Sequence, residues 1–589
     1  MPLVDLLAPP ALDFRRHVLT MGDGEAQALV VVDYPPRVGQ AWLARLAALP
    51  GVSLSLHLAP TDPLSLLKAL NSSIQEYMSR LSNGGNALVQ SRWQQSLDDA
   101  RALLKQIDQE SQKVYRAAVL LLVVAPDQEE LARRVRQVEA ACAAASMRAR
   151  PAVFKQEEGV KAAGPWGLLP REIADLGARE MPAATVAAAY PWVSSGLNHG
   201  RGIVLGRDDA GGIVLVDGWT PSVDSGLTNG NINVLGKPGS GKTFSAQIHI
   251  LRQYALGTRI LALDPLGDYG RLARSQGGCV IDASGKDGRV NPLHVSALPS
   301  AGASTPEVGT RGVLAQHVQR LKTFFGLYLP SALDALEQAV LEKAIVAAYR
   351  DRGIDWSTDP ATVGDWPTIA DVRRQVQAMG QDRLAILLES ATDGADSALW
   401  QGQSTIAIGQ ADFVVFDLEL LKDAAPNVRK AQYFNILAWA WDMVREGKAL
   451  GKHTLLVVDE AWMLIDPQTP QALQFVFEIA KGIRHYGPSP IGSALMVVTQ
   501  NVGDFLSPEV ARLGQPIIAN ASTKLLMQQD PVDIDHLRGA LRLSEAECDL
   551  LAGAKRGEGL LLAGSQHVRV RIEAAAHEAE IIAGAAPDA

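Results

Sequence analysis

The sequence predicts an α/β protein in which a domain built on a parallel sheet follows a smaller α+β domain. Length is the first observation, because 589 residues can form two or more hydrophobic cores. The second is that short apolar runs alternate with helix-length segments after residue 231, as in strands joined by crossover helices. The third is a glycine-rich segment between a predicted strand and a predicted helix, a context in which sheets bind ligands.

Composition and charge narrow the class of protein. Hydrophobic residues make up 47% and charged residues 20% of the chain, as in globular proteins. The longest apolar run, residues 117–125, is far shorter than a bilayer span, and the N-terminus lacks a signal-peptide pattern. Three scattered cysteines predict neither a disulfide framework nor a metal cluster, so we expect a reducing, cytoplasmic setting. The net charge of −9 argues against a main surface that grips DNA, but leaves room for a small basic channel shared by subunits.

Residues 1–190 are expected to form the smaller domain. Residues 1–24 carry little pattern, which predicts extended or loosely packed chain. β-Branched runs and amphipathic segments then predict strands at 26–34, 52–58, 118–125 and 148–154, and helices at 40–48, 64–81, 90–116 and 128–146. This mixture predicts an α+β sheet with helices on one face.

The rest of the chain is expected to form a linker and the larger domain. Residues 191–230 contain breaks and a hairpin at 202–217, and residues 231–589 form the larger domain. Its strands are predicted at 231–235, 259–263, 279–282, 412–417, 454–458, 494–499, 525–529, 559–563 and 567–572. Between about 306 and 400 the pattern is helical (312–325, 331–349 and 368–390), which predicts an insertion inside the sheet.

A phosphate-binding loop is the strongest chemical signal. Residues 236–243 (GKPGSGKT) fit the pattern G-x-x-x-x-G-K-[ST], in which glycines let successive backbone N–H groups point at phosphate oxygens. We expect Lys242 to reach the β- and γ-phosphates of ATP and the Thr243 hydroxyl to hold Mg²⁺. The alternative is a glycine-rich turn that caps an ordinary helix. The candidate nucleotide-binding residues are Gly236, Lys237, Pro238, Gly239, Ser240, Gly241, Lys242, Thr243 and Phe244.

Two adjacent acids supply the second part that such an ATPase needs. Asp459 and Glu460 follow the apolar strand predicted at 454–458. Asp459 is expected to hold the Mg²⁺ shell, directly or through water, and Glu460 to orient and deprotonate the attacking water. Neighbouring residues of a strand face opposite ways, but a turn at the strand end can direct both to one site. Trp462 and Met463 are expected to be core residues.

Four further polar residues are weaker candidates. Gln500 ends a predicted strand and either contacts the γ-phosphate or water, or makes a strand-end hydrogen bond. Asp264 likewise lies either near the phosphates or caps the turn after its strand. Arg484 and Arg556 are candidates for an arginine finger that enters the site of an adjacent subunit, and ordinary surface arginines are the alternative.

The order of these motifs resembles the conjugative-transfer ATPases of type IV secretion systems, the VirB4 (TraC- and TrbE-like) family within the FtsK/HerA-like P-loop proteins. The resemblance covers nearly the whole chain. It rests on residues 236–243, on the steps at 264–269 (DPLGDY) and 291–293 (NPL), on 459–462 (DEAW), on 499–500 with 504–505, and on 556–560. The chain differs in a shorter N-terminus and in Pro238 and Thr243, which stand where a small residue and Ser are more frequent.

The resemblance implies a RecA-like ATPase domain with a helical insertion, and an N-terminal domain that docks on the channel. It implies ATP hydrolysis with Mg²⁺ that powers pilus assembly or substrate transfer at the cytoplasmic base of a channel. The expected partners are further copies of the chain in a hexamer, inner-membrane channel proteins and a coupling protein. The expected location is the cytoplasm, with peripheral attachment to the inner membrane.

Two rival functions remain open from the sequence. A double-stranded DNA translocase or coupling-type pump of the FtsK/HerA kind would show ATPase activity stimulated by DNA, with steep salt dependence. A scaffold that binds nucleotide only as a structural ligand would have no need of a water-activating acid, which Glu460 argues against.

Overall fold

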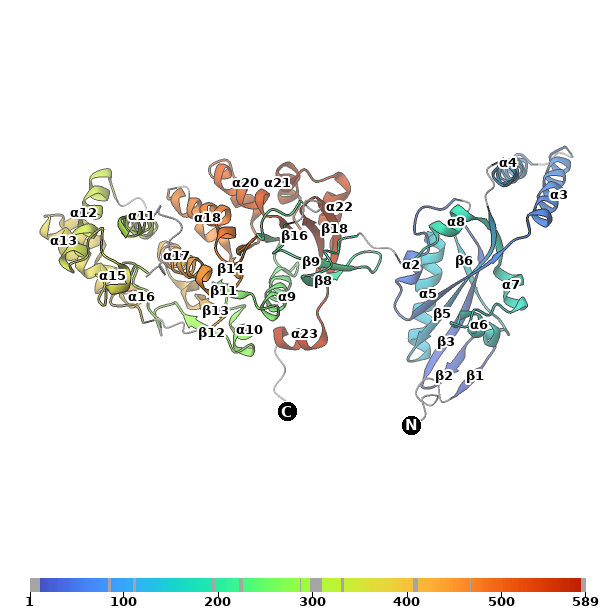
Figure 1. The fold of residues 1–589 in the computed structure, drawn as a ribbon, viewed down its shortest axis with the longest axis horizontal. Helices are drawn as coiled ribbons and strands as arrows, with labels where there is room; N and C mark the ends of the chain where they lie inside the picture. Colours follow the sequence, from blue (N-terminus) through green and yellow to red (C-terminus); the bar gives the residue numbers. More distant parts are fainter. Residues whose placement is uncertain are drawn as a thin grey trace. The chain divides into compact units, whose positions relative to one another are not determined.

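The computed structural model describes residues 11–583, except residues 36, 83–85, 110–112, 193–195, 222–225, 287, 297–309, 330–332, 406–410 and 467. It divides into two compact units, Met1–Ser195 with Ala210–Gly212, and Gly196–Asp209 with Ile213–Ala589. Each unit has its own sheet (Figure 1) and its own hydrophobic core. The α/β class predicted from the sequence is therefore confirmed. Among the described residues, no helix combines the length and apolarity needed to cross a membrane.

Unit 1 is an antiparallel sheet with helices. Its strands pair in the order β1-β2-β3-β5-β4, while β6 pairs with β3 and β7 with β5. The strands are β1 (Leu12–Phe14), β2 (Leu19–Met21), β3 (Gly24–Asp33), β4 (Val52–Pro60), β5 (Val114–Ala125), β6 (Arg148–Pro151) and β7 (Arg179–Pro182). The helices are α2 (Ala44–Ala47), α3 (Pro63–Ser82), α4 (Ala87–Gln109), α5 (Gln128–Ala144), α6 (Gln156–Ala163), α7 (Arg171–Gly177) and α8 (Ala183–Ala188).

Two expectations for unit 1 are wrong. Helices cover both faces of the sheet, because β3 is apolar on both sides: Leu29 and Val31 pack with α2 and α5, and Ala28 and Val30 with α6 and α7. The helix predicted to end at 116 ends at Gln109, because Val114 to Ala125 pair with neighbouring strands instead. The segment before residue 24, expected to be extended or loosely packed, contains the short extended strands β1 and β2, and residues 1–10 lie outside the described part.

Unit 2 contains a sheet of eleven strands, in the order β12-β13-β11-β14-β15-β10-β16-β17-β18-β8-β9. The strands from β12 to β16 are parallel, and the rest are antiparallel. The strands are β8 (Ile203–Arg207), β9 (Ile213–Val216), β10 (Ile232–Leu235), β11 (Arg259–Asp264), β12 (Cys279–Asp282), β13 (Phe413–Asp417), β14 (Thr454–Asp459), β15 (Ser493–Thr499), β16 (Thr523–Met527), β17 (Glu558–Ala563) and β18 (Gln566–Ile572). The hairpin expected within a linker thus belongs to this sheet, because β8 pairs with β18.

Helices cover both faces of this sheet (Figure 1). Helices α9 (Lys242–Ala255), α10 (Gly270–Ser275) and α23 (Ala576–Ala583) pack on one face. The other face carries α17 (Pro426–Leu450), α18 (Pro470–Gly482), α19 (Val502–Leu506), α20 (Ala511–Asn520), α21 (Pro531–Leu541) and α22 (Glu545–Gly553). The parallel strands are accordingly apolar on both sides, as a doubly covered sheet requires.

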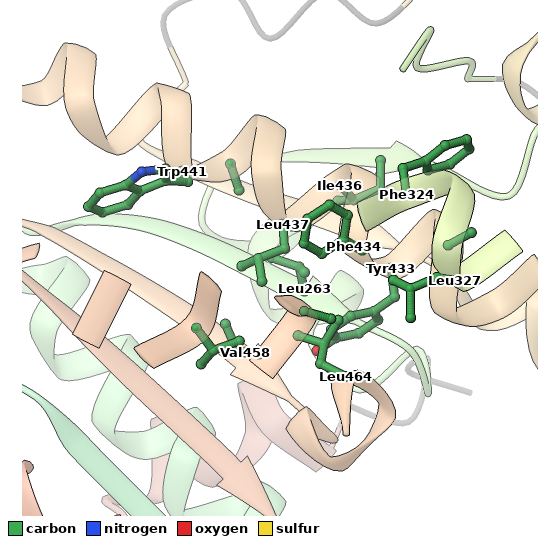
Figure 2. Close-up of a cluster of buried hydrophobic side chains, with 14 of the residues drawn as sticks. Leu263, Phe324, Leu327, Tyr433, Phe434, Ile436, Leu437, Trp441, Val458 and Leu464 are labelled. Atoms are coloured by element: carbon green, nitrogen blue, oxygen red, sulfur yellow. The ribbon is translucent and has the colours of Figure 1, made fainter. Parts of the chain in front are cut away.

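Helix α17 lies at the centre of the hydrophobic core on this second face of the sheet. Its side chains Tyr433, Phe434 and Leu437 lie between the sheet residues Leu263 and Val458 and the helix α11 (Thr310–Tyr328) (Figure 2). Burial of such a helix on several sides stabilises it more than its own helix propensity does. It also fixes the position of the residues at its N-terminal end, next to the ends of the parallel strands.

A helical insertion lies in the chain between β12 and β13. It comprises α11, α12 (Ala335–Asp351), α13 (Ile369–Ala378), α14 (Asp382–Leu387), α15 (Glu389–Thr392) and α16 (Ser397–Trp400). Residues 306–309, where it was expected to begin, and residues 331–332, the expected start of its second helix, lie outside the described part. The single helix predicted at 368–390 is wrong, because α13 ends before Gly380, whose φ of 73° is left-handed.

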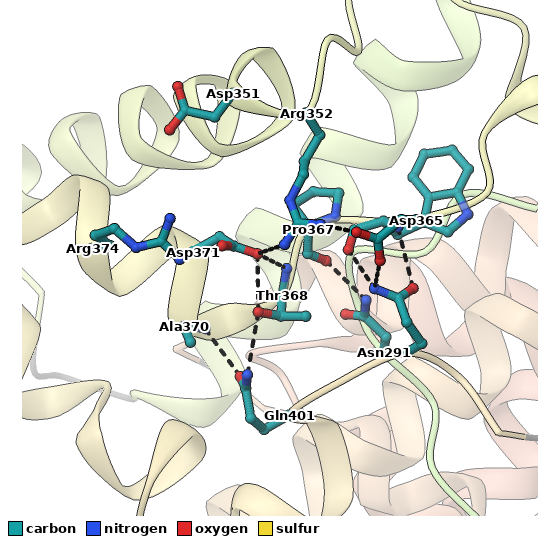
Figure 3. A network of polar contacts seen from close by, with 12 residues as sticks. Asn291, Asp351, Arg352, Asp365, Pro367, Thr368, Ala370, Asp371, Arg374 and Gln401 are labelled. Carbon is teal, nitrogen blue, oxygen red and sulfur yellow. Dashed lines mark hydrogen bonds and ion pairs between the residues drawn. The ribbon is translucent and has the colours of Figure 1, made fainter.

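Polar contacts tie the insertion to the core (Figure 3). The Asn291 side chain donates to the Pro367 carbonyl at 2.9 Å, next to the N-terminus of α13. At that N-terminus Asp371 accepts from the Thr368 backbone at 2.8 Å and pairs with Arg352 at 3.1 Å. The NPL step at 291–293 is therefore a junction between the insertion and the sheet.

Candidate active site

The site lies where the parallel strands β10, β15, β14, β11 and β13 end. In open α/β sheets, this carboxyl edge is where ligands bind. Strand β10 leads into the glycine-rich loop, β11 and β13 end on the paired acids Asp264 and Asp417, β14 ends on Asp459 followed by Glu460, and β15 is followed by Gln500.

The loop after β10 has the backbone that a phosphate cradle needs. Gly239 and Gly241 have φ values of 78° and 104°, which side chains rarely tolerate. Helix α9 begins directly afterwards at Lys242, so its free N–H groups face the loop. A Cβ on Gly236 would lie 2.7 Å from the Met527 Cβ, so only glycine fits there.

Two neighbouring segments hold this loop in place. The Lys237 backbone N–H donates to the Gln528 carbonyl at 2.8 Å, and the Gly557 N–H donates to the Ser240 carbonyl at 2.9 Å. The Ser240 hydroxyl donates to the Lys237 carbonyl at 2.7 Å, within the loop. Pro238 is exposed at the tip. The cradle is therefore preorganised by contacts from the segments that follow β16 and precede β17.

Lys242 faces the acidic pair. Its side chain is buried, and its ammonium donates to the Lys237 carbonyl at 3.2 Å. Burial lowers the pKa of Lys242, while the nearby Glu460 and Asp459 carboxylates act in the opposite direction. Lys242 in turn acts to lower the pKa of Glu460. The two motifs, separated by more than two hundred residues, thus meet at one place.

Asp459 is held on both carboxylate oxygens. The Tyr269 hydroxyl donates to Oδ2 at 3.0 Å, and the Glu460 backbone N–H donates to Oδ1 at 2.8 Å. The Tyr433 hydroxyl donates to the Asp459 carbonyl oxygen. Burial, with repulsion from Glu460, raises the pKa of Asp459 to about 8. Sequence reasoning missed both tyrosines: Tyr269 belongs to the DPLGDY step, whereas nothing in the pattern of α17 singles out Tyr433.

The chain turns sharply at Glu460. Its φ of 50° and ψ of 45° are left-handed, an uncommon conformation for a residue with a side chain. This turn allows two consecutive residues to face one site. The Trp462 indole donates to Glu460 Oε2 at 2.5 Å, and Gln500 also hydrogen-bonds to the Glu460 carboxyl group, whose pKa is raised by burial. Trp462 and Met463 pack against the core, as expected, but both are half-buried and also line a pocket with Glu460.

The two acids of the DPLGDY motif, Asp264 and Asp268, make different contacts. Asp264 is fully buried and accepts the backbone N–H groups of Asp268 and Tyr269 at 2.9 and 2.8 Å, so it caps the turn. Asp268 accepts a hydrogen bond from Thr243, which acts to lower the pKa of Asp268. Burial has the larger effect, so the pKa of Asp268 is raised. Asp268 is a site residue that was not singled out from the sequence.

The described residues fit a magnesium nucleotide. Thr243 and Asp459 are the groups that would hold Mg²⁺, Asp459 either directly or through water. The cradle after β10 leaves backbone N–H groups for phosphate oxygens. Phe244 packs into the core behind the loop. The Lys237 side chain pairs with Asp530 at 3.6 Å.

The two candidate arginines lie in different places. Arg484 donates to the Thr228 carbonyl at 3.4 Å. Thr228 precedes β10, whereas the phosphate loop follows it, so Arg484 lies near the amino-terminal end of this strand, away from the loop. Arg556 is exposed and precedes Gly557, which hydrogen-bonds to Ser240 of the same loop. The structure brings Lys242, Thr243, Asp459, Glu460 and Gln500 together, with Arg556 close to the loop, but it does not bring Arg484 to this site.

Several known proteins are similar to this chain in sequence. Residues 380–559 match the family model of the TraG P-loop domain. The uncharacterised protein pXO2-09 of Bacillus anthracis is 23% identical over 616 residues, which cover 94% of this chain and 92% of that protein. TraC of Escherichia coli strain K12 is 24% identical over 318 residues, 51% of this chain and 32% of TraC.

A solved structure is more similar in sequence. VirB4 of Thermoanaerobacter pseudethanolicus is 43% identical, with a TM-score of 0.60. The match covers 65% of this chain and 99% of the solved VirB4 chain. The chain therefore belongs to the VirB4 family of ATPases of conjugation and type IV secretion.

Proposed function

We propose that the protein is a Mg²⁺-dependent ATPase whose turnover powers the assembly of a type IV secretion or conjugation channel, or transfer through it. Membership of the VirB4 family supports the process. The observation that carries the chemistry is the meeting of Lys242 with the acidic pair Asp459 and Glu460 at the carboxyl edge of one sheet.

Each residue has a proposed role in ATP cleavage. Glu460 accepts the proton of the attacking water, and Trp462 and Gln500 hold its carboxyl group in orientation. Lys242 and the N–H groups of the loop bind the phosphates and stabilise the charge that develops during transfer. Mg²⁺, when held by Thr243 and Asp459, would neutralise charge on the β- and γ-phosphates.

The proposal extends to assembly and location. We expect a homo-oligomer, as a hexamer, in which Arg484 acts on a neighbouring subunit because it lies away from the site of its own chain. We expect Arg556 to contact the nucleotide of its own chain, because the next residue, Gly557, hydrogen-bonds to Ser240 of the loop. Inner-membrane channel proteins and a coupling protein are the expected partners, with unit 1 as the docking domain, at the cytoplasmic face of the inner membrane. These expectations rest on the family.

One experiment tests function and substrate class together. ATPase activity of the purified chain is measured against protein concentration, with and without Mg²⁺ and with and without double-stranded DNA. Activity that requires Mg²⁺ and rises with oligomer formation, without stimulation by DNA, is expected. Strong DNA stimulation that decreases steeply with salt would favour the DNA translocase instead.

A further inference from the structure

A pocket next to the catalytic acid has no role in the chemistry described so far. It encloses about 110 Å³, which is ample for several water molecules. Glu460 and Gln500 form one wall, and Arg429 and Lys422 contribute positive charge. Much of the remaining lining is apolar, including Leu266 and Leu421.

Arg429 is the unusual member of this lining. It is half-buried, its Nε is buried without a hydrogen-bond partner, and one terminal nitrogen donates to the Lys422 carbonyl at 3.2 Å. Among the residues that the structure describes, no carboxylate pairs with it. The next residue, Lys430, differs because it pairs with Asp466 at 2.8 Å. Arg429 thus offers donors that the folded chain leaves unused.

The position of Arg429 is fixed by α17. Tyr433, one helical turn later, donates its hydroxyl to the Asp459 carbonyl, so this face of the helix lies over the end of β14.

Lys422, the second cation of the pocket, is exposed and has only a distant pairing with Glu419 at 3.6 Å. A planar guanidinium in a partly apolar pocket suits an oxyanion with several acceptors, such as phosphate.

The direction of ATP cleavage points into this pocket. The water oxygen bonds to the γ-phosphorus while the bond from that phosphorus to the bridging oxygen breaks, and ADP keeps the electron pair of that oxygen. The proton of the water passes to Glu460. Because the attack is in line, the cleaved group moves away from ADP toward the side of the water, which is the side of Glu460. In the sheet, β14 lies between β10, which carries the phosphate loop, and the strands β11 and β13, which flank this pocket.

We propose that this pocket is a binding site for orthophosphate released by hydrolysis, in which Arg429 supplies the principal contact and Lys422 the positive rim. The assignment rests on the proposed ATPase function. Phosphate held there would remain in the protein after cleavage, so its departure would be a separate step from ADP release.

Binding of inorganic phosphate to the full chain tests the site directly. The protein is saturated with ADP and Mg²⁺, which fills the phosphate loop, and orthophosphate is titrated in by calorimetry. Loss of a charge-assisted contact predicts that Arg429→Ala weakens phosphate binding about tenfold or more. The inhibition constant of orthophosphate in the ATPase assay should rise by the same factor. Lys430→Ala, which removes the neighbouring cation outside the pocket, is the matched control and should bind phosphate as the wild type does.

Three results would overturn the assignment. One is phosphate binding by Arg429→Ala within twofold of the wild type. The second is an equal loss of affinity for a non-hydrolysable ATP analogue, which would place Arg429 on the γ-phosphate of bound ATP. The third is an equal loss in Lys430→Ala. If Arg429→Ala does not fold, Arg429→Met keeps the aliphatic stem and decides by the same criteria. A wild-type chain that binds phosphate but shows no turnover would refute the ATPase function and the role in product release, and would leave only the phosphate site standing.

Discussion

Replacing Glu460 with Gln should separate ATP binding from ATP cleavage. The amide has nearly the shape of the carboxyl group and keeps an oxygen that accepts the Trp462 indole N–H, so the buried position loses no hydrogen bond there. The substitution removes the negative charge of Glu460, which attracts Lys242 and repels Asp459. Loss of the attraction lowers the free energy of unfolding and loss of the repulsion raises it, so the two effects oppose each other. We therefore expect little change in melting temperature.

The effect on turnover should be large, because an amide cannot accept the proton of the attacking water. General-base catalysis typically contributes about 10²–10⁴ in rate, or roughly 3–5 kcal/mol of activation free energy. We expect kcat to fall by that factor, while the dissociation constant of ATP does not rise. The assay combines steady-state turnover, single-turnover cleavage of radiolabelled ATP, and retention of uncleaved ATP on the protein.

Glu478→Gln is the matched control, since Glu478 is exposed on α18, and it should leave kcat unchanged. Turnover by Glu460→Gln within threefold of the wild type would refute the assignment of Glu460 as the base. A fall in kcat accompanied by an equal loss of ATP affinity would refute it as well, because the residue would then act in binding.

Further substitutions test other parts of the site and fold. Lys242→Ala should weaken ATP binding and abolish turnover in an equilibrium binding and ATPase assay, and wild-type activity would disprove its role. Arg556→Ala should raise the KM for ATP at every protein concentration. Arg484→Ala should reduce kcat only at protein concentrations at which the oligomer forms. Steady-state kinetics measured against protein concentration test both, and the reverse pattern would contradict both placements. Burial lowers the pKa of Lys524 in β16 from 10.5 to about 8, so the unfolded chain binds more protons between these values and stability rises with pH there. Lys524→Met should therefore raise the melting temperature at pH 7, and the gain should shrink as pH rises above about 8; a gain independent of pH would refute this reasoning.

Much of the larger unit was predictable because its strands are short apolar runs with polar ends. The smaller unit was less so. The sequence near residue 116 continues a helical pattern, but pairing of Arg116 with Ala59 and Glu180 draws it into β5. Such pairing joins residues far apart in the chain, and a local pattern does not contain it. Gly380 could have signalled the break after α13, since glycine is the usual residue at such a helix end.

For the site, the types of the chemical residues were predictable from the sequence, but the contacts that position these residues were not. The spacing of 236–243 and the acids after β14 predict the chemistry, because glycine turns and paired acids have few other uses together. Tyr433 and Arg429 come from a helix whose sequence reads as an ordinary core helix. Only the packing of α17 on the sheet brings them to Asp459 and the pocket.

The sequence by itself determined the family, the phosphate loop and the identity of the acids, because these depend on residue type and local spacing. Tertiary structure decided which groups share the site, which arginine lies beside the loop, and which cation of the pocket has no carboxylate partner among the described residues. Those outcomes depend on the order of strands in the sheet, which places segments distant along the chain at one edge.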